Sequence, residues 1–227
     1  MLHSQRAEAY QRLKEVRLTL ETIKSLESTD VLVPDPSNVT VLRGLYYVHL
    51  YAALEFTVNS ATQAVLQQIA ALNVRYSDFV PSLYSIALDG AFKSVRDARS
   101  EQWKKRLALL ATQFSNDTCT VSPVVFSSDL QNIWYKTLVE LFDCLGITSL
   151  PVPDIRLKQY IDEIVEKRNA VAHGRESPIL AAAGRRSPDL EQRYDAVSKT
   201  IDYLFDCFEG YLQRRDFVRQ DQRAAYP

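Results

Sequence analysis

The sequence predicts an all-α protein with a long, buried central helix. Only six glycines occur in 227 residues, while Leu, Ala, Gln, Glu and Arg, which favour helices over sheets, are frequent. Apolar residues also recur at the three- and four-residue spacings of helices along several long segments. A hydrophobic fraction of 46% is enough for a real core. We expect one domain over residues 1–227.

The first helix is expected over residues 4–28. Its apolar positions are spaced by four, three, four and three residues, and they are Ala9, Leu13, Val16, Leu20 and Ile23. This spacing is typical of a seam for a partner helix, either inside the fold or across a dimer. Two prolines and an Asn in the segment VLVPDPSN at 31–38 end the helix, because they cannot continue it.

A long second helix is expected from residue 39 to about residue 72. It is apolar on most sides between Leu45 and Phe56, so we expect it to be central and buried. Glu55 lies in this stretch, and a carboxylate on a buried helix usually has a cationic partner. The tyrosines beside it are interpreted as packing residues.

Residues 74–128 are interpreted as an insertion between core helices. They contain an expected helix at 101–114, followed at 115–125 by a loop with a short strand. Basic residues in this region could contact an RNA backbone, although a solvated helix face with interspersed acidic residues is the more common arrangement. These residues are Lys93, Arg96, Arg99, Lys104, Lys105 and Arg106.

Three further helices are expected in the second half of the chain. The first covers residues 128–146, between a Ser/Asp cap and Gly146. The second covers residues 155–173 and ends at Gly174, and the third runs from about 188 to 217. The tail, residues 219–227, is expected to be flexible.

Bulk composition excludes several classes of protein. The net charge is −1, so any nucleic-acid site must be a local patch. Three cysteines without a CxxC motif indicate free thiols in a reducing compartment. The chain begins without a signal-peptide pattern and contains no apolar run of about 18 residues, which predicts a cytoplasmic protein that does not associate with membranes. The histidines lack metal-ligand spacing, so neither a metal nor a cofactor is expected.

The segment KRNAVAHGRES at 167–177 places polar groups on an apolar helix face. On a helical wheel the buried stripe consists of Leu157, Ile161, Ile164 and Val171. Arg168 falls within that stripe. Asn169 and His173 lie one turn apart near its edge, with Glu166 beside them. A buried guanidinium is costly unless it is paired or lines a cleft, so Arg168 either pairs in the core, with Glu55 as a candidate, or opens into a groove.

These residues resemble the R-x4–6-H signature of the HEPN superfamily, whose arginine, following polar residue and histidine match Arg168, Asn169 and His173. The stretch LYYVHLYAALEFTVN at 45–59 is similar to the long second helix of the RiboL-PSP-HEPN-like branch. The resemblance implies an up-and-down bundle of four or five helices that forms a homodimer through the motif face, so that the two motifs meet in a cleft.

The resemblance also implies a metal-independent endoribonuclease that acts on RNA as a toxin or anti-phage defence effector, with an antitoxin or defence-system protein as its partner. Histidine can transfer protons near neutral pH, and arginine can grip phosphate oxygens. The catalytic candidates are Arg168, Asn169 and His173, the supporting candidates Glu55 and Glu166, and the RNA-binding candidates Arg175, Arg185 and Arg186.

Two alternatives stay open. Some family members have lost catalysis, so the chain could be a module that binds RNA, a nucleotide or a protein partner. In the other alternative the chain is a purely structural scaffold, with Arg168 in an ion pair and His173 at a helix end beside the helix dipole.

Overall fold

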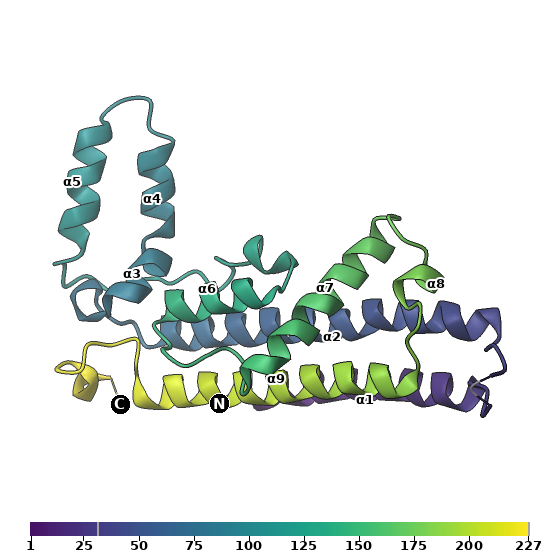
Figure 1. Ribbon diagram of the computed structural model, residues 1–227. Coiled ribbons are helices and arrows are strands. Elements are labelled where there is room, and N and C mark those ends of the chain that lie inside the picture. The colour runs from purple at the N-terminus through teal and green to yellow at the C-terminus, as the bar shows by residue number, and fades with distance from the viewer. Residues whose placement is uncertain (31, 227) are drawn as a thin grey trace.

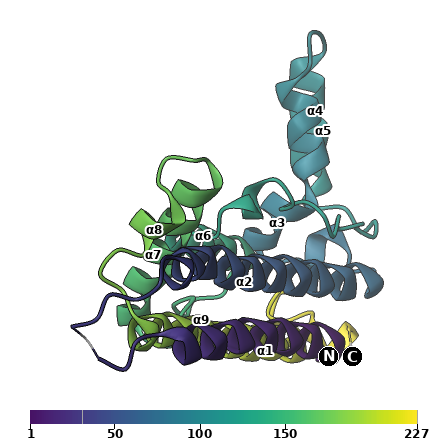
Figure 2. The same cartoon turned by 90° about the vertical axis from the view of Figure 1, so that its right-hand side faces the viewer.

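The computed structural model describes residues 1–30 and 32–226, and its regular elements are helices (Figure 1). This confirms the predicted all-α class. The three longest helices lie along one another, with α2 between α1 and α9 on one side and the shorter helices α6, α7 and α8 on the other (Figures 1 and 2). The bounds are α1 His3–Leu26, α2 Ser37–Ala71, α6 Tyr135–Leu145, α7 Lys158–Ala172, α8 Pro178–Ala181 and α9 Ser187–Arg214.

Helix α2 is central and buried, as its sequence predicts. Its large side chains are covered on several sides of the helix, and the fully covered ones include Tyr46, Tyr47, Leu50 and Leu54. A helix of 35 residues that is apolar around most of its circumference needs neighbours on more than one side. Helices α1, α7, α8 and α9 all supply them.

Helix α1 uses the expected seam inside the fold. All five predicted seam residues are buried, and they face α2 and α9. The end of α1 is joined to the starts of α2 and α9 by a cluster of buried charges. Arg43 pairs there with Glu27 at 2.6 Å and also with Asp35, and the hydroxyl of Ser187 donates to Glu27 at 2.7 Å.

Helix α6 starts later than the expected residue 128. Residues Asp129–Gln131 form a single 3-10 turn, and Asn132 then has an extended backbone with φ −135° and ψ 100°. Contacts with distant residues account for this break. The amide of Ile133 donates to the hydroxyl of Tyr51 at 3.1 Å, and the amide of Tyr135 donates to the Asp162 carboxylate at 2.9 Å.

The region expected as an insertion holds three short α-helices, α3 Pro81–Ala87, α4 Asp89–Arg96 and α5 Gln102–Thr112. Helices α4 and α5 form a hairpin that projects away from the rest of the molecule (Figures 1 and 2). In place of the strand expected at 115–125, the described residues contain an isolated bridge between Arg75 and Thr118.

The end of the chain, expected to be flexible from residue 219, folds back onto the body as far as it is described. The hydroxyl of Tyr226 donates to Asp78 at 2.6 Å and accepts from the amide of Arg75 at 3.1 Å. Residue 227 lies outside the described residues. Among the helices of residues 1–30 and 32–226, none has the length and hydropathy needed to cross a membrane.

Candidate functional site

Helix α7 carries the motif and is fixed against α2 by its apolar side. Ile161, Ile164 and Val165 are fully buried, which turns the following turn of the helix toward the middle of α2. Arg168 lies on this side, where its side chain is 22% exposed. The guanidinium is therefore held by the fold but still reaches solvent.

Arg168 makes three polar contacts. Its Nη1 donates to Oδ1 of Asn169 at 2.7 Å and to Oδ1 of Asn132 at 3.5 Å. Its Nη2 lies 3.5 Å from Oε2 of Glu55, so the structure contains the ion pair for which Glu55 was a candidate. A guanidinium has five N–H donors, and these contacts occupy three. The Nε donor and one Nη2 donor have no partner within the described part of the chain.

The ring of Tyr51 packs against the guanidinium of Arg168. The guanidinium carbon of Arg168 lies 4.3 Å from the centre of the Tyr51 ring, a favourable cation–π distance. The Tyr51 hydroxyl lies 3.1 Å from Oε1 of Glu55 and 2.9 Å from the carbonyl of Gln131. Burial raises the pKa of Tyr51 far above its usual range, so its ring is neutral at any physiological pH.

The sequence pattern does not identify Tyr51 and Asn132 as site residues. Tyr51 lies four residues before Glu55, so a helical wheel places both on one face of α2. That signal is present in the sequence, but the apolar stretch around these tyrosines favours their interpretation as packing residues. Asn132 gives no such signal, because only the folded chain brings it to α7.

His173 ends the helix. Its backbone amide donates to the carbonyl of Asn169 at 3.1 Å, one turn back, and Gly174 follows with φ +68°. This left-handed conformation suits glycine and stops the helix. The His173 side chain is exposed, and its ring makes no hydrogen bond or ion pair with residues 1–30 or 32–226. The ring is therefore available to a ligand or to a second chain.

The other candidate residues make no hydrogen bond or ion pair with Arg168 in the described part of the chain. Glu166 and Arg175 are exposed. Arg185 lies 3.4 Å from Glu163, on a part of α7 before the motif. Arg186 belongs to the cluster of charges at the end of α1, where it donates to the carbonyl of Ser28 at 2.6 Å. Arg185 and Arg186 thus have protein partners that compete with a phosphate, whereas Arg175 has none among the described residues.

The chain matches the family model described as RiboL-PSP-HEPN over residues 8–210. The match covers most of the sequence, including both α2 and the motif. The chain belongs to the RiboL-PSP-HEPN family. No curated protein and no solved structure matches it. Membership of this HEPN family indicates a nuclease or another RNA-related function.

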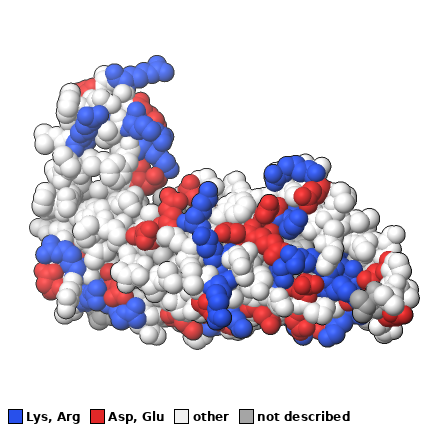
Figure 3. Space-filling view, in the orientation of Figure 1, with Lys and Arg blue, Asp and Glu red and all other residues white. Residues whose placement is uncertain are grey.

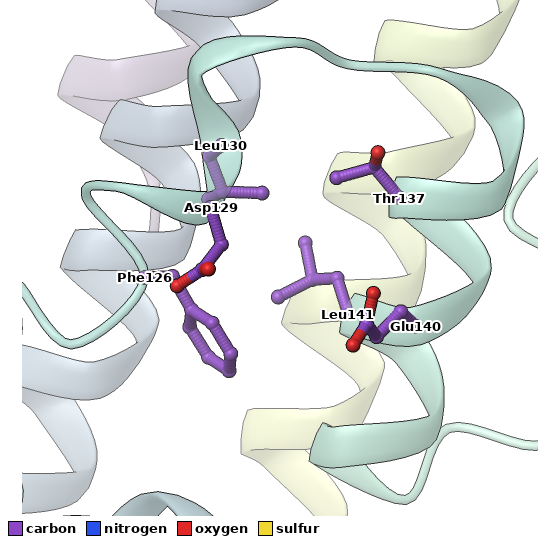
Figure 4. Close-up of a pocket in the computed structure, with 6 residues that line it drawn as sticks. All are labelled: Phe126, Asp129, Leu130, Thr137, Glu140 and Leu141. Carbon is purple, nitrogen blue, oxygen red and sulfur yellow. The ribbon is translucent and has the colours of Figure 1, made fainter.

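A pocket of about 200 Å³ in this RiboL-PSP-HEPN protein lies beside α6 rather than at the motif (Figure 4). The carboxylates of Asp129 and Glu140 line it together with Leu130 and Leu141. Two carboxylates disfavour a phosphate group there, which argues against this pocket as an RNA site. Among the described residues, no group of three or more His, Cys, Asp and Glu side chains is arranged to hold a metal ion.

A second hollow in the HEPN domain is lined mainly by aromatic and basic side chains rather than by carboxylates. It has a volume of about 320 Å³, and its lining residues are Trp134, Tyr135, Lys136, Lys158 and Asp162. Asp162 is already bonded to the amide of Tyr135, which leaves two lysines and two aromatic rings for a ligand. This hollow begins two residues after Asn132, the partner of Arg168, and lies at the first turns of α7.

Proposed function

We propose that this HEPN chain is a metal-independent endoribonuclease that cleaves RNA by attack of a 2′-hydroxyl at a site composed of two copies of the chain. One observation carries the proposal. Arg168 is held in a fixed position with spare donors, while the ring of His173, at the end of the same helix, is exposed and has no partner. Positive charge for a phosphate and a group for proton transfer therefore lie on the last two turns of one helix.

Arg168 is the group proposed to bind the scissile phosphate. A guanidinium remains charged at any physiological pH and can donate to two phosphate oxygens at once. Its contacts with Asn169, Glu55 and the Tyr51 ring keep it oriented, so little conformational freedom is lost when RNA binds. The proposed role of Asn169 is to hold Arg168, and that of Glu55 is to set the direction of its free donors.

His173 is the group proposed to transfer protons. One histidine takes the proton of the 2′-hydroxyl as its oxygen forms a bond to phosphorus, and the bond from phosphorus to the 5′-oxygen breaks. The leaving oxygen takes a proton from a second, protonated imidazole. The products are a 2′,3′-cyclic phosphate and a 5′-hydroxyl. Because the motif contains one histidine per chain, the partner subunit's His173 is the proposed second group.

The hollow beside Asn132 is proposed to hold a neighbouring nucleotide. Base stacking on aromatic rings and phosphate contacts with lysines are the common means of binding single-stranded RNA. Trp134 and Lys158 offer both, and Arg175, two residues after His173, adds an exposed cation. In the cell the proposed role is that of a toxin or anti-phage effector in the cytoplasm, restrained by an antitoxin or a defence-system partner.

The test compares the wild type with His173→Ala and Arg168→Ala on mixed cellular RNA in EDTA. Cleavage is followed on a denaturing gel, and the new 3′ ends are assayed for cyclic phosphate. The matched control is His3→Ala, because His3 is an exposed histidine on α1, away from the motif. We expect activity in the wild type and control, and its loss in both motif variants. An inactive wild type that forms dimers contradicts the proposal.

A non-catalytic HEPN module that binds RNA, a nucleotide or a protein partner is the second candidate. The observation that favours it is the pairing of Arg168, whose charge is already balanced by Glu55 within one chain. In this case the wild type binds a single-stranded oligonucleotide without cleaving it. His173→Ala then leaves affinity unchanged, whereas Arg168→Ala lowers it.

A further inference from the structure

The projecting α4–α5 hairpin lacks a core of its own. Neither helix contains a buried residue, although α5 and the turn after it are rich in large apolar side chains. The space between the two helices is a hollow of about 260 Å³ lined by Phe92, Val95, Leu109 and Leu110, with Arg106 at its side. Two short helices that bury so little are marginally stable in water, which indicates that something covers them.

The apolar side chains of α5 form one continuous stripe. Trp103 is 78% exposed, Leu107 71%, Leu110 61% and Phe114, just beyond the helix, 80%. The intervals of four, three and four residues are those of a helix-packing seam, and the same pattern in α1 is fully buried. Figure 3 shows the hairpin with a broad uncharged area and with its basic side chains mostly toward the upper end and right edge.

We propose that the stripe Trp103, Leu107, Leu110 and Phe114 is covered in solution by the same stripe of a second copy of this chain, with the two α5 helices antiparallel. A two-fold symmetric contact requires a surface that is complementary to itself. The intervals four, three and four read the same in both directions. An axis between residues 108 and 109 therefore sets Leu107 against the partner subunit's Leu110, and Trp103 against the partner subunit's Phe114.

The charges beside the stripe are compatible with an antiparallel pair. At about 100° per residue Lys105 points away from the stripe. Lys104 lies at its side, level with the uncharged Gln113 of the partner subunit. The ring of Trp103 is also partly covered by Arg106, whose guanidinium carbon lies 4.9 Å from the ring centre.

The area of the stripe suits a pair of chains. A covered aromatic side chain buries about 150–250 Å², so the two aromatic residues and two leucines offer roughly 500 Å² per chain and about 1,000 Å² per pair. That is near the lower limit for a specific interface, and Phe92, 48% exposed on α4, adds to it. This contact is separate from the motif-to-motif contact of the proposed nuclease, so either can fail without the other.

The first test is the oligomeric state of Leu107→Glu with Leu110→Glu, measured by sedimentation beside the wild type. The matched control is Leu32→Glu, because Leu32 is a leucine 91% exposed in a distant loop. We expect the double variant to form a smaller oligomer, with a dissociation constant raised about tenfold or more per substitution, while it stays folded and unfolds in a cooperative thermal transition. A monomeric wild type, or an oligomer unaffected by both substitutions, overturns the proposal.

The second test fixes the direction of packing by disulfide formation. In a background with Cys119, Cys144 and Cys207 changed to Ser, Leu107→Cys and Leu110→Cys are made as separate chains. The antiparallel contact crosslinks a mixture of the two chains and neither chain alone, whereas a parallel contact crosslinks each alone and overturns the proposed arrangement. If the double Glu variant instead loses affinity for single-stranded RNA without changing its oligomeric state, the stripe is an RNA surface and the proposal is wrong.

Discussion

The guanidinium carbon of Arg168 lies 4.3 Å from the centre of the Tyr51 ring. This contact joins the motif helix α7 to the central helix α2, and the Tyr51 hydroxyl continues it to the backbone of Gln131 and Ile133. The position of the motif arginine therefore depends on a tyrosine that is more than a hundred residues away in the sequence and outside the motif. Substitutions of Tyr51 can separate the contribution of its ring, which contacts Arg168, from that of its hydroxyl, which bonds the backbone.

Tyr51→Phe removes the hydroxyl and keeps the ring. The buried amide of Ile133 then loses its acceptor, so we expect the free energy of unfolding to fall by about 1–3 kcal/mol. Arg168 keeps its aromatic support, and RNA cleavage or binding stays within a few-fold of the wild type. Tyr51→Leu loses both contributions, so activity falls about tenfold or more as well. Urea denaturation and RNA assays separate the two variants, and equal activity losses in both would contradict this division.

Local features of the chain were predictable from sequence, and contacts between distant segments were not. The α1 seam and the end of α7 at Gly174 depend on spacing and on one backbone conformation, so pattern alone identifies them. The sequence pattern predicts the start of α6 several residues too early, because Tyr51 and Asp162 determine where it begins. For the same reason the sequence does not identify Asn132 as a site residue. A sequence gives the faces of each helix but not which distant residue meets them.

Two adjacent tyrosines of α2 are expected to respond differently to loss of the hydroxyl. The Tyr46 hydroxyl is buried without a hydrogen-bond partner among the described residues, so Tyr46→Phe leaves the free energy of unfolding unchanged or raises it. The Tyr47 hydroxyl donates to Glu163 at 3.2 Å, so Tyr47→Phe lowers it by about 1–2 kcal/mol. Urea denaturation of both variants provides the comparison, with each serving as the other's control.

Gly44 allows α8 to approach α2 closely. A Cβ atom at this position would lie 2.0 Å from the carbonyl oxygen of Pro178, a backbone atom that cannot turn aside. We expect Gly44→Ala to displace α8 and to lower the free energy of unfolding by about 1–3 kcal/mol. The control is Gly90→Ala on α4, where nothing lies within 4 Å and alanine should stabilise the helix by roughly 0.5–1 kcal/mol. Thermal denaturation should show opposite signs for the two variants.

The Asp35 carboxylate makes stability depend on acid pH. The amide of Ser28 and the guanidinium of Arg43 lower the pKa of Asp35 below its ordinary value of 3.8. As pH falls through this range, the unfolded chain binds the proton first, so protonation favours unfolding. The stabilisation is complete above pH 3.8 and is lost as the pH falls through the lower folded-state pKa.

Asp35→Asn should therefore be less stable at neutral pH and should lose less stability on acidification than the wild type does. The measurement is the urea midpoint at a series of pH values between neutrality and the acid limit. Asp143→Asn is the control, because Asp143 is exposed and its side chain makes no hydrogen bond or ion pair with the described part of the chain. A wild-type slope retained in Asp35→Asn would contradict this assignment.

The composite nuclease site can be tested by mixing subunits. Wild-type and His173→Ala chains are co-expressed with different tags in known ratios, so that mixed dimers form. If one site needs His173 from both subunits, only wild-type pairs are active, and RNA cleavage follows the square of the wild-type fraction. If each chain holds a complete site, cleavage follows that fraction linearly. At equal amounts the two cases predict about one quarter and about one half of full activity, and His3→Ala chains, mixed in the same way, should leave activity undiminished.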